Sequence, residues 1–530
     1  MFSQRSPIII VQNVIGAIVG YVGLLFILRD IGTLQWGFVS FGIGFVGVLS
    51  VFGDLGYSTA HSIKVSQGED IGTCNGTFLT IKLILGLTFI ALVFAVLEIW
   101  TRVLHRGFES PLEYYVALAL IPYYFFQSFT GFTTTYFKAK LKSVRASVPP
   151  IVEAILRNSI FVFLALIVQF NVSNTVKEDA AIFLAGTYSI TYSVYFVTSY
   201  LLGRPWEIRP ATKKMLREYT AIALPLMILS GVGTLNGNID KVVIQFFWGA
   251  VATGAFLSMQ TISNLIGTLG SSMSTFFLPL LVRLHRQLGK EAHNRSIFEF
   301  ERLISLYLLP FVVVLAFLSK YVLNIFTGAY VDYSTALTLL SVRAYISAIN
   351  SPYYSSIASR MKTKLIATID MVFVAMNIVL ILVLVPTSIL GFRLAALGTT
   401  GAALAMLITG VLSNATYRVV VNRMEHIGYN TGMVRQIVPV AVMLAFLSVI
   451  VDFVNAKPFF TLLGISLVSI AIYFLMAVAI RETSFKEIIS VARSFDPRLM
   501  AARFREERSE NENDISEVLT ETSADMNGKV

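Results

Sequence analysis

The stretch that runs from Gly16 to Gly56, GAIVGYVGLLFILRDIGTLQWGFVSFGIGFVGVLSVFGDLG, decides the fold of this sequence. It is apolar apart from a short turn at Asp30–Gln35, so it predicts two membrane helices joined by that turn. Five of its glycines have counterparts 217 positions later, in the pairs Gly16 and Gly233, Gly20 and Gly237, Gly32 and Gly249, Gly37 and Gly254, and Gly53 and Gly270. One offset shared by five glycines on apolar backgrounds indicates a duplicated half-protein.

The composition of the whole chain agrees with a membrane protein. It is 55% hydrophobic and 14% charged, with a mean hydropathy of +0.73, whereas a soluble domain carries about 25% charged residues. The single cysteine, Cys74, excludes an internal disulfide, and the five histidines lie in or beside predicted loops. We therefore expect no metal and no cofactor. The net charge of +10 is scattered over loops, which argues against a nucleic-acid partner.

Segments of about 20 apolar residues predict fourteen membrane spans. They are residues 7–28, 36–58, 76–100, 114–137, 148–169, 180–202, 219–247, 251–282, 300–325, 335–359, 366–386, 395–420, 434–453 and 460–480. One set of connecting loops holds 21 Lys and Arg residues and the opposite set holds eight. The positive-inside rule then predicts a multi-pass protein of the cell membrane with both termini in the cytoplasm.

The repeat predicts the domain organisation of an all-α polytopic membrane protein. Two six-helix bundles, 1–203 and 204–420, are expected to be related by a pseudo-two-fold axis along the membrane normal, with an additional helix pair at 421–480. Residues 481–530 are expected to form an amphipathic segment and an acidic, disordered tail. Phe485, Ile488, Ile489 and Ala492 share one helical face, which predicts a short helix on the inner membrane surface; a continuation of the last span is the alternative.

Charged residues inside spans are candidate functional residues, because each costs about 2.5–3.5 kcal/mol at a helix centre. Arg343 lies near the middle of the tenth span and either faces a substrate cavity or pairs with a buried carboxylate. Glu153 and Arg157 lie four apart in the fifth span, the spacing of an ion pair or of a cavity wall. Asp240 and Lys241 are neighbours in the seventh span and need not pair, since neighbouring side chains point in different directions.

Asp54, Lys82 and Asp370 lie near the cytoplasmic ends of their spans. Contact with solvent or lipid headgroups explains charges at these positions, and a basic residue there could also bind a phosphate.

Several of these residues resemble the signature of a known family. In the first half they are Arg29, Gly32, Trp36-Gly37 and Gly53-Asp54-Leu55-Gly56; in the second half they are Pro225, Asn238-Ile239-Asp240-Lys241, Gly249, Gly254, Pro279 and Gly328-Ala329-Tyr330. The pattern is similar to that of polysaccharide-transporter flippases of the multidrug/oligosaccharidyl-lipid/polysaccharide exporter superfamily, over about residues 7–480. The peptidoglycan-precursor branch carries several arginines in its first helix, whereas this first span has none before Arg29.

The resemblance implies a flippase that moves a lipid-linked oligosaccharide from the cytoplasmic to the outer leaflet by alternating access. It implies cationic cavity residues that bind the head group, for which Arg343, Lys241, Arg157 and Lys82 are the candidates, whereas Asp240, Glu153 and Asp54 are candidates for coupling or ion pairing. The expected partners are this substrate, membrane lipids and glycan-assembly enzymes, and we expect a monomer.

Two other functions fit a membrane chain of this kind. An ion-coupled drug or cation antiporter of the same superfamily needs embedded carboxylates, of which the spans offer few. A membrane glycosyltransferase or polymerase needs catalytic carboxylates on a sizeable loop, and neither an Asp-x-Asp motif nor a long outer loop occurs in the sequence. We therefore predict that the protein is not an enzyme.

Overall fold

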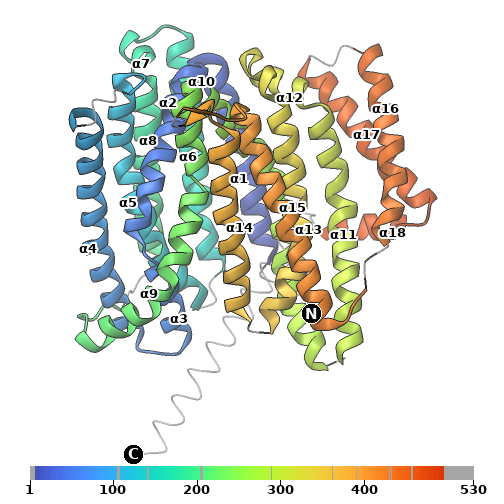
Figure 1. Cartoon of the computed structure of the whole chain (residues 1–530), viewed down its shortest axis with the longest axis horizontal. Helices are drawn as coiled ribbons and strands as arrows, with labels where there is room; N and C mark the ends of the chain where they lie inside the picture. The colour runs from blue at the N-terminus through green and yellow to red at the C-terminus, as the bar shows by residue number, and fades with distance from the viewer. Residues whose placement is uncertain are drawn as a thin grey trace, which may run out of the picture.

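The computed structural model describes residues 6–103, 108–139, 143–202, 207–287, 289–360, 362–389, 391–428, 430, 432–454 and 458–494 (Figure 1). The long helices are α1 (Ser6–Phe26), α2 (Thr33–Leu49), α4 (Ile71–Glu98), α5 (Pro111–Ala139), α6 (Ser143–Gln169), α8 (Ala180–Leu202), α9 (Lys213–Asn236), α10 (Ile239–Gln287), α11 (Gly289–Phe317), α13 (Ser334–Ser359), α14 (Thr363–Leu384), α15 (Gly398–Glu425), α16 (Ile437–Phe453) and α17 (Phe459–Ala479). The short ones are η1 (Ile27–Ile31), η2 (Ser50–Gly53), α3 (Tyr57–Ser66), η3 (Ile99–Val103), α7 (Asn174–Glu178), α12 (Ser319–Phe326), η4 (Gly328–Tyr333), η5 (Gly432–Gln436) and α18 (Phe485–Ser494). Strands β1 (Ser388–Ile389) and β2 (Phe392–Arg393) form a small antiparallel hairpin.

The helical membrane class is confirmed. Every predicted span overlaps at least one long helix, and ten segments of the described chain are long and apolar enough to cross a membrane. One of these segments, Lys213–Gly270, contains the seventh predicted span and part of the eighth. The number fourteen therefore stays a prediction. The seventh span is also not one continuous helix, because α9 ends at Asn236 and α10 begins at Ile239.

The outer surface of the bundle is apolar, as a lipid-facing surface must be. On α4, Leu83, Ile84 and Leu87 expose 52%, 59% and 58% of their surface, whereas Phe78 and Lys82 on the opposite face are fully buried. Removing apolar surface from water is favourable by about 25 cal/mol of free energy per Å². Lipid is the environment in which this arrangement is favourable, with apolar residues outside and polar residues within.

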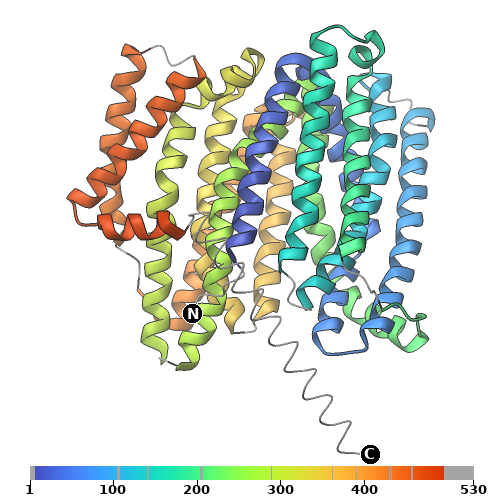
Figure 2. The same cartoon turned by 180° about the vertical axis from the view of Figure 1, so that it is seen from behind.

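The same helix pairs pack in both halves of the chain. In the first half α5 packs on α8 and α6 packs on α1 and α8; in the second half α13 packs on α15 and α14 packs on α9 and α15. Figures 1 and 2 show α4, α5 and α8 toward one side, α11 and α13 toward the other, and α16 and α17 at the far edge. The bundles 1–203 and 204–420, their boundaries and the pseudo-two-fold axis stay predictions.

Two of the repeated glycine pairs have a structural role that can be seen directly. Gly32 and Gly249 both have a positive φ, 109° and 80°, and both break a helix at the same place in their half. Gly37 and Gly254 lie at the crossing of α2 and α10, where a Cβ on Gly37 would lie 2.1 Å from the carbonyl oxygen of Ala250. The glycines thus allow a close helix crossing that larger residues would prevent.

The C-terminal helix α18 is separate from the last long helix. A break at residues 480–484, with a φ of 58° at Arg481, ends the preceding helix, and α18 runs across its end in Figure 1. A continuation of the last span was therefore the wrong alternative. Phe485 and Ile489 remain exposed, and their place on the inner membrane surface stays a prediction. The predicted acidic tail lies outside the described residues.

Candidate functional site

Three cavities lie inside the helix bundle. The second-half cavity, of about 370 Å³, is lined by residues that include Asn236, Arg343, Asp370, Asn377 and Thr409. The first-half cavity, of about 430 Å³, is lined by residues that include Tyr21, Trp36, Arg157, Asn158 and Tyr188. The central cavity, of about 680 Å³, lies between the halves and is lined by residues that include Asp54, Gln127, Asn238, Lys241 and Gln260.

Arg343 lines the second-half cavity from α13 and is the cationic candidate that stays unpaired. Within the described residues its guanidinium makes no hydrogen bond and no ion pair, and the carboxylate of Asp240 attracts it electrostatically. Asp370 lines the same cavity from α14, where it accepts a hydrogen bond from the hydroxyl of Tyr417 at 2.7 Å. Of the two predicted alternatives, a cavity position is the one that the structure shows.

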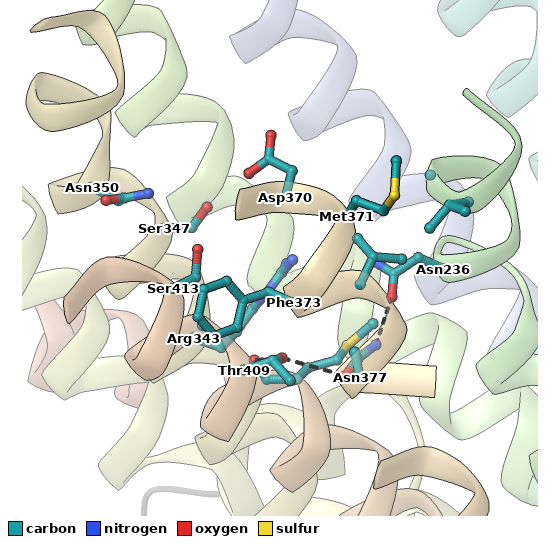
Figure 3. A pocket seen from close by; sticks show the side chains of 15 residues that line it. Asn236, Arg343, Ser347, Asn350, Asp370, Met371, Phe373, Asn377, Thr409 and Ser413 are labelled. Atoms are coloured by element: carbon teal, nitrogen blue, oxygen red, sulfur yellow. Dashed lines mark hydrogen bonds between the residues drawn. The ribbon is translucent and has the colours of Figure 1, made fainter. Parts of the chain in front are cut away.

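The rest of this cavity is lined by amides and hydroxyls. Asn377 donates to the side-chain oxygen of Asn236 at 2.7 Å and accepts from the hydroxyl of Thr409 at 3.4 Å (Figure 3). These bonds connect α9, α14 and α15 around the cavity. An anion in the second-half cavity would therefore meet the unpaired guanidinium of Arg343 and these neutral amides and hydroxyls, with the carboxylate of Asp370 as the one acidic group among the lining residues. A guanidinium in a low-dielectric site can bind an anion through charge-assisted hydrogen bonds.

Asp240 and Lys241 form an ion pair where α9 gives way to α10. Lys241 Nζ lies 3.1 Å from Asp240 Oδ1 and donates to the Gly237 carbonyl at 2.8 Å, while Gln260 donates to Asp240 Oδ2 at 2.8 Å. The expectation that these neighbours need not pair missed this contact, because the lysine side chain folds back toward the turn. Lys241 lines the central cavity, and Asp240 is fully buried.

Glu153 and Arg157 form the ion pair that their spacing predicted. Arg157 Nε lies 2.6 Å from Glu153 Oε1, and its guanidinium lies over the ring of Tyr188 at 5.1 Å from the centroid. Arg157 also lines the first-half cavity. The two alternatives, an ion pair and a cavity wall, therefore both apply to this arginine.

Lys82 and Asp54 also form an ion pair, which the sequence analysis did not predict. The ammonium of Lys82 contacts Asp54 and donates to the Gly53 carbonyl at 3.1 Å, and Ser58 also donates to the same carboxylate. Asp54 lines the central cavity, whereas Lys82 is fully buried behind it and is not among the lining residues of the three cavities. A role for Lys82 would thus be to hold Asp54.

A match between a family model and the first part of the sequence assigns the chain to a family. The family model described as "Polysaccharide biosynthesis protein" matches residues 4–285, which is more than half of the 530-residue chain. The chain belongs to the polysaccharide biosynthesis protein family. No curated protein sequence matches this family member significantly.

Solved structures share the fold at low sequence identity. The lipid II flippase MurJ in an inward closed conformation matches with a TM-score of 0.69 and 17% identity, over 89% of this chain and 98% of that chain. An inward-facing MATE multidrug resistance transporter of the MOP superfamily matches with a TM-score of 0.60 and 12% identity, over 78% of this chain and 96% of that chain. A MOP superfamily transporter from Pyrococcus furiosus matches with a TM-score of 0.51 and 15% identity, over 79% of this chain and 96% of that chain. This family member therefore shares its fold with these solved flippase and transporter structures.

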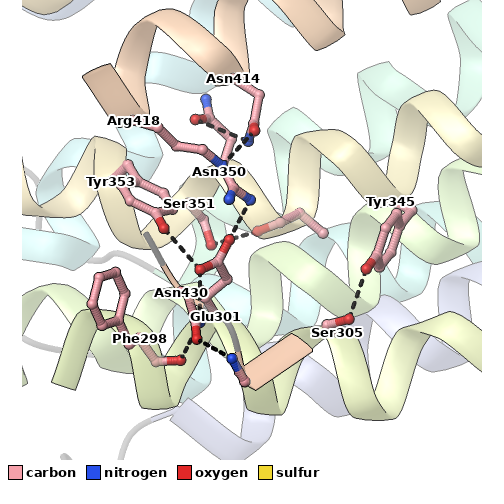
Figure 4. Close-up of polar contacts among 12 residues, drawn as sticks. Phe298, Glu301, Ser305, Tyr345, Asn350, Ser351, Tyr353, Asn414, Arg418 and Asn430 are labelled. Atoms are coloured by element: carbon pink, nitrogen blue, oxygen red, sulfur yellow. Dashed lines mark hydrogen bonds and ion pairs between the residues drawn. The ribbon is translucent and has the colours of Figure 1, made fainter. Parts of the chain in front are cut away.

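The sequence reasoning missed a buried polar network in the second half. Glu301 on α11 is fully buried and contacts Arg418 on α15, and it accepts hydrogen bonds from Tyr353 at 2.7 Å and Asn430 at 3.0 Å (Figure 4). Arg418 lies within α15, with its guanidinium over the ring of Tyr353. Glu301 stands beside Arg302 at the start of the ninth predicted span, where charged residues are common, so its signal in the sequence is weak.

Neutral polar residues were missed as well, because only charges were weighed. Tyr123 and Asn264 both line the first-half and the central cavity. Their signal in the sequence is weak, since amides and tyrosines in membrane helices often only connect neighbouring helices.

The halves also meet at α3, which packs on α9. Lys64 contacts Glu218, and His61 Nδ1 forms a 2.9 Å hydrogen bond with the hydroxyl of Tyr219. Burial lowers the pKa of His61 to about 4, and the positive charge of Lys82 adds to the shift. His61 is therefore neutral at pH 7.

Proposed function

We propose that the protein is a flippase that moves a lipid-linked oligosaccharide from the cytoplasmic to the outer leaflet by alternating access. The observation that carries the proposal is Arg343, whose guanidinium has no partner among the described residues and lines a cavity inside a membrane helix bundle. A phosphate-linked head group must lose its hydration to cross the bilayer, and a buried guanidinium replaces those contacts with charge-assisted hydrogen bonds. The lipid tail would stay in the bilayer throughout.

The packing of the halves supports alternating access. They contact each other through α2 and α10 near Gly37, and through α3 and α9 near His61. The central cavity lies between these two contacts and involves α2 and α10 from opposite halves. Opening one contact while the other holds would expose the cavity to one side at a time.

The remaining predictions belong to this proposal. The Lys and Arg bias of the loops supports a cytoplasmic location of both termini. The partners are the lipid-linked substrate, membrane lipids and the enzymes that assemble the glycan, and the protein acts as a monomer.

One observation favours a drug or cation antiporter as the second candidate. Asp370 lines the second-half cavity without a basic partner among the described residues, its bond from Tyr417 being neutral. The other embedded candidates, Asp54, Glu153 and Asp240, are each paired with a cation. One free carboxylate among these four makes cation transport the weaker alternative.

The test is mass spectrometry of lipid-linked glycans in cells that lack the protein, with leaflets assigned by protection from an added glycosidase. We expect a complete lipid-linked oligosaccharide to accumulate in the cytoplasmic leaflet. Wild type should relieve the accumulation and Arg343→Ala should not, whereas Arg393→Ala, an exposed arginine on β2, is the matched control. Unchanged glycolipids would contradict the flippase and favour the antiporter, and a truncated glycan would indicate an enzyme.

A further inference from the structure

The central and the first-half cavity adjoin. They share five lining residues, which are Ile43, Tyr123, Leu257, Thr261 and Asn264. Their other polar lining groups are mostly hydroxyls and amides, for example Ser50, Gln127, Thr130, Thr234, Asn238 and Gln260. These groups can donate and accept hydrogen bonds without carrying charge.

The charges in these joined cavities are neutralised by partners. Lys241 is paired with Asp240, Arg157 with Glu153, and Asp54 with Lys82. A carboxylate on a ligand would have to break one of these buried ion pairs to gain a cation, and it would leave the former partner buried and uncompensated. A ligand made of uncharged polar groups has no such cost.

Tyr123 and Asn264 stand out where the two cavities join. The amide of Asn264 is exposed, and within the described residues it makes no hydrogen bond. Tyr123 is half-buried, and its hydroxyl accepts a hydrogen bond from Gln127 at 3.2 Å. Its ring makes edge-to-face contacts with three tyrosines, at centroid distances of 4.7 Å to Tyr124, 5.4 Å to Tyr188 and 4.5 Å to Tyr192. A fixed aromatic ring therefore lines the same space as an available amide.

A ring flanked by amides and hydroxyls matches the chemistry of a sugar. A pyranose has a face of C–H groups, which packs on an aromatic ring, and an edge of hydroxyls, which an amide can bind with both its donor and its acceptor. We infer that the joined cavities bind uncharged sugar rings, with Tyr123 as the stacking platform and Asn264 as the hydrogen-bonding group. The inference rests on the proposed function and specifies its substrate as a glycan whose bound sugars are neutral.

The test is binding of three probes to the full chain in lipid nanodiscs, measured by microscale thermophoresis. The probes are a short prenyl diphosphate alone, the same prenyl diphosphate linked to N-acetylglucosamine, and the same linked to glucuronic acid. We expect the N-acetylglucosamine probe to bind about tenfold more tightly than the bare diphosphate, and the glucuronic acid probe to bind no more tightly than the bare one.

The variants separate the sugar from the head group. Asn264→Ala and Tyr123→Ala should each remove most of the tenfold gain, and Tyr123→Phe should keep it because the ring remains. Asn324→Ala on α12, an exposed asparagine that lines none of the three cavities, is the matched control. Melting curves of each variant show that it is folded.

The outcomes distinguish the two proposals. Equal binding of all three probes, with loss of all binding in Arg343→Ala, would overturn the sugar site and leave the flippase intact. Tighter binding of the glucuronic acid probe, or a sugar gain that survives Asn264→Ala and Tyr123→Ala, would also overturn the sugar site. Absence of binding by every probe would overturn both proposals.

Discussion

Replacement of Gly37 by alanine tests whether the close crossing of α2 and α10 holds the halves together. The added Cβ would lie 2.1 Å from the carbonyl oxygen and 2.9 Å from the Cβ of Ala250. Since non-bonded heavy atoms are favourably placed at about 3.5 Å, the two helices would have to separate by roughly 1.4 Å. Overpacking of this kind costs about 1–3 kcal/mol.

The chain supplies a matched control at Gly20, where an added Cβ would have no neighbouring atom within 4 Å. Gly20→Ala adds the same methyl group to a helix and should stabilise the protein by about 0.5–1 kcal/mol, because alanine loses less backbone entropy than glycine. Gly254→Ala should fall between the two, since its Cβ would lie 3.0 Å from the backbone of Gly37.

The assay is SDS titration of the purified protein in lipid micelles, followed by circular dichroism, with the midpoint compared among the three variants. We expect Gly37→Ala to unfold at a lower SDS fraction than wild type and Gly20→Ala at the same or a higher one. If Gly37→Ala and Gly20→Ala had the same midpoint, the crossing would not be tight and the reasoning would be refuted.

Three further predictions concern buried ionisable side chains. The pKa of His61 is about 4 in the folded protein and about 6.5 in an unfolded chain, so its contribution to the free energy of unfolding should be complete above pH 6.5 and fall by about 3 kcal/mol as the pH drops to 4. His61→Gln should therefore make the melting temperature depend less steeply on pH between 4 and 6.5, and an unchanged slope would contradict the low pKa of His61. Arg418→Met should destabilise by about 3 kcal/mol, since it leaves Glu301 buried without its cation; the double variant with Glu301→Gln should recover part of the loss in a thermal melt, and no recovery would argue against the pair. Lys82→Met should likewise lower the melting temperature, and adding Asp54→Asn should restore it in part; additive losses would show that the two side chains act independently.

The sequence alone determined the features that depend on local order along the chain. The apolar runs predicted helices that cross a membrane, because their length and composition match the bilayer. The ion pair of Glu153 and Arg157 followed from four-residue spacing on one helix. The glycine offset of 217 residues predicted the duplication, and Gly32 and Gly249 break the chain at equivalent places.

Only the tertiary structure decided which charges are paired and which are free. Lys82 forms an ion pair with Asp54 on another segment, and Arg418 forms one with Glu301 on α11. Arg343 forms no ion pair within the described residues. Each outcome depends on which helix faces which, and helix packing is set by side chains far apart in the sequence. Tyr123 and Asn264 likewise become a candidate sugar site only because α5 and α10, from opposite halves, line the same space.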